Sequence, residues 1–377
     1  MRISRFVLKP CIAALFTAVA LAPTRADAQT VYGVVVADDT GEPVAGAMVL
    51  LADTLGLSRG SALADSLGRF AITARSPGRY TLAADRVGYQ SLGPDTVGIP
   101  PDSLQVQLRA GSRRITLPPV TARARGRCAG RLEQNPQTAV VWEEARKALA
   151  SAALLEESGA YEYTARVDRR EVRLRGGEPM SHHVWVRSST GSPFITLPPE
   201  ELVDGGYVQA DADSLILYGV GPAVVLSELF VQRHCFGLRD GGAERVGLQF
   251  VPIRTTGSPD VRGVLWLDRA TGELRTLEFT YTGLAFRGPV ERLGGELEFR
   301  RIPSGAWIVS RWVVRGPLLT HHADWALAEI PMARFRIRAL RETSGEVLSI
   351  HGRDGRPVRM VRGEAAIVPA DIRLRPQ

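Results

Sequence analysis

Cysteine, lysine and histidine are scarce in this chain of 377 residues, and their scarcity limits the chemistry that it can perform. The sequence has three cysteines, six histidines and two lysines. No histidine is followed three residues later by glutamate, so the His-x-x-Glu metal pair of one large class of zinc peptidases is absent. A phosphate-binding loop and a complete dinucleotide fingerprint are absent as well. We therefore expect no peptidase activity of that class, no nucleotide cofactor and no bound metal.

The first 28 residues (1–28) have the three parts of a signal peptide. Arg2, Arg5 and Lys9 flank the start of an apolar run, CIAALFTAVALA, which is shorter than the ~20 residues that span a bilayer. Ala26 and Ala28 then occupy the two positions that a signal peptidase reads. We expect cleavage after Ala28 and export to the periplasm or the outer membrane, with no transmembrane segment in the mature chain. A retained N-terminal anchor is the alternative.

Much of the positive charge lies in one short segment. The formal net charge is +7, and it falls to about +4 without residues 1–28, which hold four basic residues and one acidic residue. Five arginines without an acidic neighbour, and two consecutive prolines, lie within residues 111–135. We interpret this segment as a solvated basic linker. No broad basic face with interleaved aromatic residues accompanies it, so we expect no nucleic-acid partner.

Residues 30–110 contain six or seven short strand patterns at intervals of ~8–12 residues, a spacing typical of a β-sandwich. Three stretches in this region follow one another with glycines and aromatic residues in a fixed order: VYGVVVADDTGEPVAGAMV, DSLGRF and PGRYTLAADRVGY. In this order the region resembles the carboxypeptidase regulatory-like domain, which has a transthyretin-like (prealbumin-like) sandwich fold.

The resemblance implies a fold and an accessory role more than an activity. In that family the domain occurs beside zinc carboxypeptidases, in surface adhesion proteins and at the N-terminus of TonB-dependent outer-membrane receptors. It also shares its fold with some carbohydrate-binding modules. We expect Tyr80 and Tyr89 to pack at the edge of the sandwich. Stacking of a sugar on either ring is the functional alternative.

The clearest helix is predicted over residues 136–155. Asn135 is a favourable N-cap, proline follows it at the first helical position, and Gly159 lies beyond the end. Glu143 and Lys147 are expected to pair one turn apart on the exposed face of this helix.

Residues 136–377 as a whole predict a mainly β domain. A second helix is expected over 222–235, and a series of hairpins with short turns follows, so neighbouring strands are antiparallel. We expect one curved antiparallel sheet, or half-barrel, with one or two helices on its concave side. The hairpin series GVLWLDRATGELRTLEFTY resembles the periplasmic lipoprotein-carrier fold, a half-open barrel that holds acyl chains.

Five aromatic residues of this domain are candidates for lining an apolar cavity, if the resemblance to a carrier holds. They are Trp266, Phe279, Tyr281, Trp307 and Trp312. Aromatic residues at every second position of a strand pack in the core more often than they contact a ligand. A filled core is therefore the alternative for all five.

Two cysteines remain once the signal peptide is removed. In an oxidising compartment an even pair is usually bonded, which predicts a Cys128–Cys235 disulfide between the linker and the second helix. A catalytic Cys235 with His234 as its base is the alternative, although adjacent side chains seldom face each other.

The two adjacent histidine pairs, at 182–183 and 321–322, offer a weak metal signal. Neighbouring side chains of a strand point to opposite faces, so each pair gives at most one ligand to a given site. A zinc site of His183, His321 and Asp324 is a further alternative, without support from any short ligand spacing.

These observations favour an exported, non-enzymatic protein of the cell envelope, in which the regulatory-like sandwich acts as an interaction or docking module. Its partner would be an envelope protein, a glycan or a lipid. The alternative is a periplasmic carrier or binder of lipid, or of another apolar ligand, in the C-terminal half-barrel. A continuous cavity would favour the carrier, whereas a filled core would exclude it.

Overall fold

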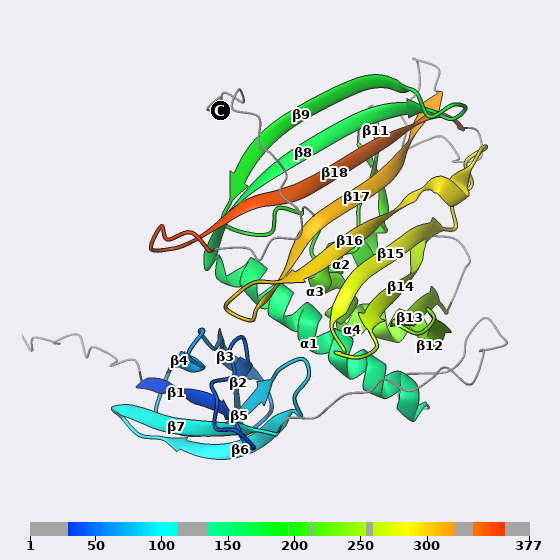
Figure 1. The fold of residues 1–377 in the computed structure, drawn as a ribbon. Helices are drawn as coiled ribbons and strands as arrows, with labels where there is room; N and C mark the ends of the chain where they lie inside the picture. The colour runs from blue at the N-terminus through cyan, green and yellow to red at the C-terminus, as the bar shows by residue number, and fades with distance from the viewer. Residues whose placement is uncertain are drawn as a thin grey trace, which may run out of the picture.

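The fold consists of an N-terminal sandwich that lies against a larger curved sheet (Figure 1). The computed structural model describes residues 29–111, 135–194, 196–211, 214–253, 259–320 and 335–358. The predicted signal peptide and most of the predicted linker lie outside these ranges. Among the described residues, no helix is long and apolar enough to cross a membrane.

The first seven strands form two sheets that share one core. Their bounds are β1 (Gln29–Ala37), β2 (Met48–Asp53), β3 (Ser58–Leu63), β4 (Arg69–Ala74), β5 (Gly78–Asp85), β6 (Leu92–Ile99) and β7 (Ser103–Ala110). One sheet has the order β4-β1-β7 and the other the order β3-β2-β5-β6. Val35, Leu51 and Ile72 are buried between them, and buried residues alternate with exposed ones along β4. The expected prealbumin-like sandwich is confirmed.

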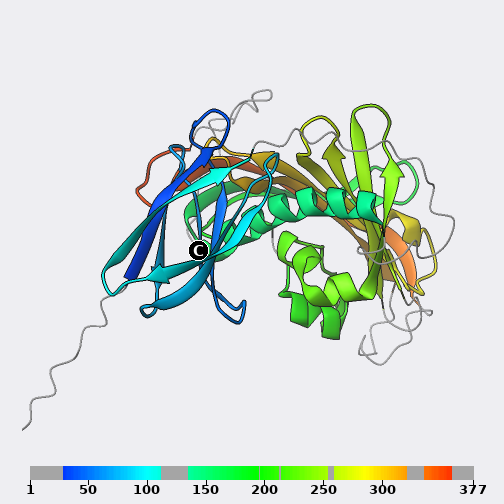
Figure 2. The same ribbon diagram turned by 90° about the horizontal axis from the view of Figure 1, so that it is seen from below.

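The second body is a nine-stranded antiparallel sheet that curves over a group of helices (Figure 2). Its strands are β8 (Tyr161–Arg173), β9 (Pro179–Ser189), β12 (His234–Asp240), β13 (Arg245–Pro252), β14 (Asp260–Asp268), β15 (Leu274–Thr282), β16 (Gly294–Arg301), β17 (Trp307–Thr320) and β18 (Arg336–Gly352). Their spatial order is β12-β13-β14-β15-β16-β17-β18-β8-β9. The last strand, β18, pairs with the first, β8, along most of its length. The expected curved antiparallel half-barrel is confirmed.

Helix α1 (Pro136–Ser158) crosses the inner, concave face of this sheet (Figure 2). The Asn135 side chain accepts hydrogen bonds from two backbone N–H groups of the first turn, and Gly159 ends the helix in the left-handed conformation. Both caps were expected, and the helix runs three residues further than its apolar stripe suggested. Val141, Ala145 and Leu149 are buried in the core that α1 shares with the sheet.

The remaining helices are short. They are α2 (Pro199–Gly205), α3 (Pro222–Leu226), α4 (Glu228–Arg233) and the 3-10 turn η2 (Val290–Arg292). The single helix expected over 222–235 is wrong, because Ser227 adopts an extended conformation between α3 and α4 and caps α4 with its hydroxyl. The helical stretch also ends two residues early, so Cys235 lies in β12. A two-stranded hairpin, β10 (Val208–Asp211) with β11 (Ser214–Leu217), completes the domain.

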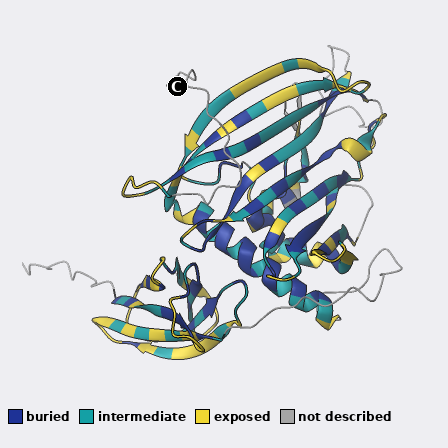
Figure 3. Cartoon of the chain, in the orientation of Figure 1, coloured by how far each residue is buried: buried dark blue, intermediate teal, exposed yellow. Residues whose placement is uncertain are grey.

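The two faces of the large sheet differ in character. On the inner face, side chains such as Leu277, Leu297 and Trp312 belong to the same buried cluster as the residues of α1. On the outer face, alternate positions of the strands carry charged residues, and Figure 3 shows the resulting stripes of intermediate and exposed positions. The strands β8, β9, β17 and β18 extend beyond α1 (Figure 1).

Candidate ligand-binding pocket

A pocket of about 540 Å³ lies on the inner face of the sheet, and α1 contributes no residue to its lining. Strands β8, β9, β17 and β18 contribute to it from the sheet, while β11 and residues 193–194 close it from the other side. The residues that line it are Val167, Arg169, Trp185, Arg187, Pro193, Phe194, Ile216, Leu217, Tyr218, Gly219, Trp312, Val314, Gly316, Pro317, Arg341 and Thr343. The volume falls within the range of ~300–1,000 Å³ that is usual for small-molecule sites.

Aromatic rings form much of the pocket wall. Trp312 lies edge-on to Phe194, with ring centroids 6.2 Å apart. The Trp312 indole also lies across Gly345 of the neighbouring strand, where a Cβ atom would overlap the ring. Glycine at this position is therefore what lets the indole lie flat over β18. Trp185 contributes a second indole from the edge strand β9.

Three arginines line the same pocket, and no aspartate or glutamate does so among the described residues. The guanidinium carbon of Arg169 lies 5.4 Å from the centroid of the Trp185 ring, a cation–π contact. Arg341 forms an ion pair with Glu171 at 3.2 Å. No carboxylate within ion-pair distance is found for Arg169 or Arg187 in the described part of the chain.

The outer face of the same strands provides the contrast. There, Arg315 and Arg170 both contact Glu342, at 2.8 and 2.7 Å. Arg311 contacts Glu346 at 3.0 Å. A smaller pocket of about 320 Å³ on this face is lined by four arginines and five acidic residues. Charges on the outer face thus neutralise one another across the strands, whereas those in the inner pocket are mostly cationic.

The arginines of the pocket were missed in the sequence, although a signal for one of them exists. In the stretch YEYTARVDRR, the inward residues Tyr163, Ala165 and Val167 recur at every second position. Continuing that period places Arg169 on the inner face, beside the apolar residues. Arg169 is exposed, as its charge suggested, although it lies on the inner face. The pairing of β8 with β9 sets Arg187 opposite Ala165, 22 positions away, and no local pattern shows this register.

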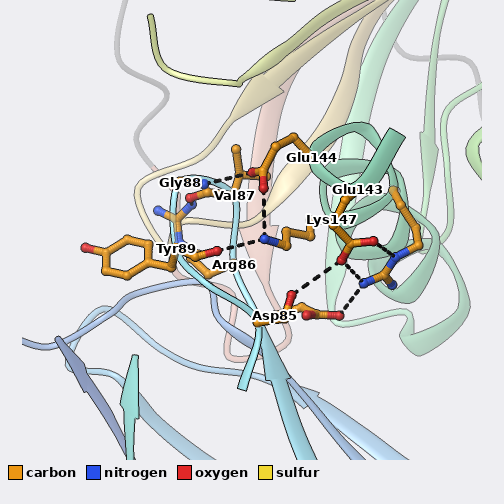
Figure 4. A network of polar contacts seen from close by, with 10 residues as sticks. Asp85, Arg86, Val87, Gly88, Tyr89, Glu143, Glu144 and Lys147 are labelled. Carbon is orange, nitrogen blue, oxygen red and sulfur yellow. Dashed lines mark hydrogen bonds and ion pairs between the residues drawn. The ribbon is translucent and has the colours of Figure 1, made fainter. Parts of the chain in front are cut away.

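A second candidate site is the contact between the sandwich and α1, a network of polar contacts (Figure 4). Arg146 of α1 donates a hydrogen bond to Asp85 at the end of β5, with 2.7 Å between Nη2 and Oδ2. It also donates to Glu143 on its own helix at 2.7 Å. The hydrogen bond from Arg146 lowers the pKa of the Glu143 carboxyl.

Beside this pair, Lys147 links the two domains (Figure 4). Its ammonium donates to the backbone carbonyl of Tyr89 at 2.7 Å and to Oε1 of Glu144 at 2.9 Å. The other carboxylate oxygen of Glu144 accepts from the backbone N–H of Gly88 at 3.1 Å. Both Lys147 and Glu144 are buried. The expectation of an exposed Glu143–Lys147 pair is wrong, because the sandwich covers this face of the helix.

Backbone packing and apolar contacts complete the interface. A Cβ atom at Gly305, in the β16–β17 turn, would overlap the backbone of Ala45 and Gly46 in the sandwich. Val87 belongs to the core of the half-barrel and not to that of the sandwich. Burial, together with the nearby charge of Arg301, lowers the pKa of Arg86 to about 10. These contacts hold the sandwich in a defined position on the half-barrel.

The two tyrosines considered for sugar stacking have structural positions. Tyr80 is buried, and its hydroxyl donates to the carbonyl of Ser76 at 2.9 Å. Its ring therefore packs in the sandwich. Tyr89 packs against the same core, and its carbonyl accepts the hydrogen bond from Lys147.

The five aromatic residues considered for cavity lining do not share one cavity. Trp307 and Tyr281 are buried in the core, where the Tyr281 hydroxyl donates to the carbonyl of Tyr218 at 2.8 Å. Phe279 is buried too and borders a separate pocket of about 430 Å³. Trp266 packs against the guanidinium group of Arg245. Trp312 alone among the five lines the inner pocket.

His234 and Cys235 begin β12, and both are buried. The two ring nitrogens of His234 lie 2.9 Å from the carbonyl oxygen of Phe230 and 3.0 Å from that of Val261. The imidazole thus links α4 to β14 and is not a base for the neighbouring thiol. Cys235 is disulfide-bonded. Cys128 lies outside the described residues, so the pairing of these two cysteines stays a prediction.

Among the described residues, the weaker catalytic and metal signals do not come together in one site. His183 lies on the edge strand β9, whereas His321 and Asp324 lie outside the described residues. In the described part of the chain, no three His, Cys, Asp or Glu residues cluster as metal ligands do. Residues 56–60 have the Gly-x-Ser-x-Gly spacing of a hydrolase nucleophile. They lie at the turn and start of an antiparallel hairpin, β2–β3, whereas the hydrolase motif joins a strand to a helix.

Comparison with known proteins identifies the sandwich. Residues 30–113 match the family model of the carboxypeptidase regulatory-like domain. No curated protein sequence shows significant similarity to the chain. A minor pilin of Streptococcus agalactiae, GBS52, is 22% identical over 26% of this chain, with a TM-score of 0.21. The match spans 48% of the pilin, about half of its length.

A second solved structure is similar over a longer stretch. It is a protein from Bacteroides fragilis described as membrane-associated and of unknown function. The match covers 86% of this chain and 96% of that one, at 10% identity and a TM-score of 0.17. The family model is the more specific of these findings, and by it the chain contains a carboxypeptidase regulatory-like domain at residues 30–113.

Proposed function

We propose that the chain is an exported, non-catalytic interaction protein of the cell envelope, whose half-barrel binds a ligand in the inner pocket. The observation that carries the proposal is the pocket itself. It has a suitable volume, an aromatic wall formed by Trp185, Trp312 and Phe194, and a small number of polar groups in its lining. This combination is typical of sites that bind small organic molecules.

The sandwich serves in this proposal as an accessory docking module. Its first docking partner is α1 of the same chain, through the contacts of Asp85, Gly88 and Tyr89. The β2–β3 turn exposes two large apolar side chains, Leu55 at 83% and Leu57 at 56%. An envelope protein or a glycan is the partner that we propose for the exposed part of the sandwich, in line with the accessory role of this domain in its family.

The inner pocket favours a binder of one small molecule over the carrier of acyl chains that was the alternative hypothesis. The aromatic cluster first considered for the cavity lies mostly in the core, which argues against a large apolar cavity beneath α1. The inner pocket lies further along the sheet and is smaller than a cavity for several acyl chains would be. We therefore propose a binder of one small molecule and not a carrier of a multiply acylated protein.

Native mass spectrometry of the protein purified from its own cell envelope tests this proposal. We expect a folded species carrying the mass of one small organic molecule, which is released when the protein is denatured. Subcellular fractionation of the same cells should recover the protein outside the cytoplasm, with its N-terminus at Gln29. A protein found only as the bare chain, from every preparation, would contradict the proposed binding function.

A further inference from the structure

We propose that the inner pocket selects an organic anion with an apolar body, a single anionic amphiphile held by Arg169 and Arg187. This inference rests on the proposed function and specifies its ligand class. It follows from the distribution of charge over the two faces of one group of strands. Each face carries several arginines, and the faces differ in what those arginines contact.

On the outer face the arginines are already neutralised. The pocket of about 320 Å³ there includes Arg311 and Arg315, each within 3.0 Å of a glutamate. A ligand anion would have to compete with those carboxylates, which are held in place by the strand register. The outer face therefore offers little net attraction to an anion.

On the inner face, basic side chains outnumber acidic ones. The pocket of about 540 Å³ is lined by three arginines and by no acidic residue among those described. Arg341 is matched by Glu171 at 3.2 Å. The positive charges of Arg169 and Arg187 are left without a carboxylate partner in the described part of the chain. Cationic side chains in a concave site with apolar walls attract anions more strongly than the same charges on an open surface do.

The position of Arg169 suits a bound anion. Its guanidinium lies over the Trp185 ring, at 5.4 Å from the centroid, so the ring supports one face of the group. The N–H groups of a guanidinium point outwards in its plane and bind a carboxylate or a phosphate with two parallel hydrogen bonds. Arg169 lies opposite His183, two positions before Trp185 on β9. Arg187 lies two positions after Trp185 on the same face, so the two arginines flank the Trp185 ring.

The remainder of the lining is apolar and aromatic. Trp312, Phe194 and Leu217 belong to or pack against the hydrophobic core, and Ile216 is 37% exposed on the hairpin opposite the sheet. A small inorganic anion would leave this surface in contact with water. An amphiphile matches both the arginines and the apolar lining of the pocket, because its charged group binds the arginines while its apolar body covers the aromatic wall.

The test compares dodecanoate with dodecanol, two molecules of equal chain length that differ in charge. Binding to the purified full chain is measured by isothermal titration calorimetry at submicellar concentration. We expect dodecanoate to bind at least tenfold more tightly than dodecanol. In the double variant Arg169→Gln with Arg187→Gln, dodecanoate should lose that advantage while the affinity for dodecanol stays unchanged. Arg311→Gln, on the outer face, is the matched control and should leave both affinities unchanged.

The outcomes separate this inference from the proposed function. Equal affinity for the two molecules would overturn the anion selectivity and leave the binding function intact. Binding of neither molecule, nor of any organic molecule from the envelope, would overturn both. Vesicles of phosphatidylcholine with phosphatidylglycerol form a third arm. If the wild-type protein bound those vesicles and not dodecanoate, the arginines would serve a membrane surface, and the assignment to a free amphiphile would be wrong.

Discussion

Lys147 and Glu144 form an ion pair of 2.9 Å whose side chains are only 3% and 5% exposed, at the point where the sandwich meets α1. Each partner also contacts the backbone of the sandwich, at Tyr89 and Gly88 respectively. The pair therefore has all its main hydrogen-bond partners only while the domains are docked. A buried pair of this kind contributes little net stability by itself, but removing one partner leaves an uncompensated charge.

The variant Lys147→Met should thus destabilise the protein strongly. The carboxylate of Glu144 would remain buried with one backbone donor, and we expect the free energy of unfolding to fall by about 3–5 kcal/mol. Urea denaturation followed by fluorescence measures this change. The double variant Lys147→Met with Glu144→Leu should recover part of the loss. A single variant as stable as the wild type would show that the pair is not buried by the sandwich.

Gly305→Ala tests the backbone contact between the domains. The added Cβ would overlap the backbone of Ala45, and Gly305 also has a positive φ of 87°. Gly355 has a similar φ of 74° with no atom within 4 Å of such a Cβ, so Gly355→Ala isolates the effect of the backbone conformation. We expect Gly305→Ala to destabilise more than its control does, by about 1–3 kcal/mol, and to enlarge the radius of gyration in small-angle scattering. Equal effects of the two changes would argue against the close contact.

Glu156 near the end of α1 should make stability depend on pH. Burial raises the pKa of its carboxyl to about 7, against an opposing hydrogen bond from Ser192, whereas the ordinary value is 4.5. Between these values the folded state binds more protons than the unfolded state, so the free energy of unfolding falls as the pH rises from 4.5 to 7. Part of the Glu156 side chain is accessible to solvent, which weakens the effect of burial. We therefore expect Glu156→Gln to raise the free energy of unfolding at pH 8 by no more than roughly 1 kcal/mol.

Thermal unfolding of Glu156→Gln and of the wild type between pH 4 and pH 8 checks this prediction. The two curves should converge at the acidic end, separate between pH 4.5 and pH 7, and stay a constant distance apart at higher pH, with the variant more stable. Glu157→Gln, at the exposed neighbouring position, is the control and should follow the wild type. If the wild type instead became more stable relative to Glu156→Gln as the pH rises, the pKa of Glu156 would not be raised by burial, and the prediction would be wrong.

The predicted Cys128–Cys235 disulfide would close a loop of about 107 residues. On the chain-entropy account such a bond contributes up to ~4–5 kcal/mol, so Cys235→Ser should be markedly less stable. Cys11→Ser, in the predicted signal peptide, should leave the mature protein unchanged. Peptide mapping of the protein purified from its own cells, without reductant, should recover the two cysteines in one linked pair. Two free thiols there would refute the pairing.

Local signals in the sequence predicted local structure well. The side chain of Asn135 and the left-handed Gly159 mark the ends of α1 as expected, since capping depends on a few neighbouring residues. The hairpin series expected after residue 235 also forms, and in the turn after β14 the Gly272 N–H donates to the Asp268 carbonyl at 2.9 Å. Such features need no information about distant parts of the chain.

Features that depend on distant contacts were not predicted. Lys147 was expected to be exposed because nothing in its own helix shows that the sandwich covers it. The pairing of β18 with β8 sets Gly345 beside Val167, 178 positions apart, and no local pattern specifies that register. The pocket follows from this pairing, because it brings Trp312 and Trp185 to one face. Only tertiary structure could therefore locate the site.

The most direct test of the account is to fill the inner pocket from within. Gly316 lines it, and a Cβ atom there would have only Leu217 nearby, at 4.0 Å, so Gly316→Phe places a ring in the pocket without displacing the backbone. Gly98→Phe, in the sandwich where a Cβ would meet no atom within 4 Å, is the matched control. We predict that Gly316→Phe folds and no longer binds dodecanoate in titration calorimetry, while Gly98→Phe binds it as the wild type does. Unchanged binding by a folded Gly316→Phe would contradict the central claim that this pocket is the ligand site.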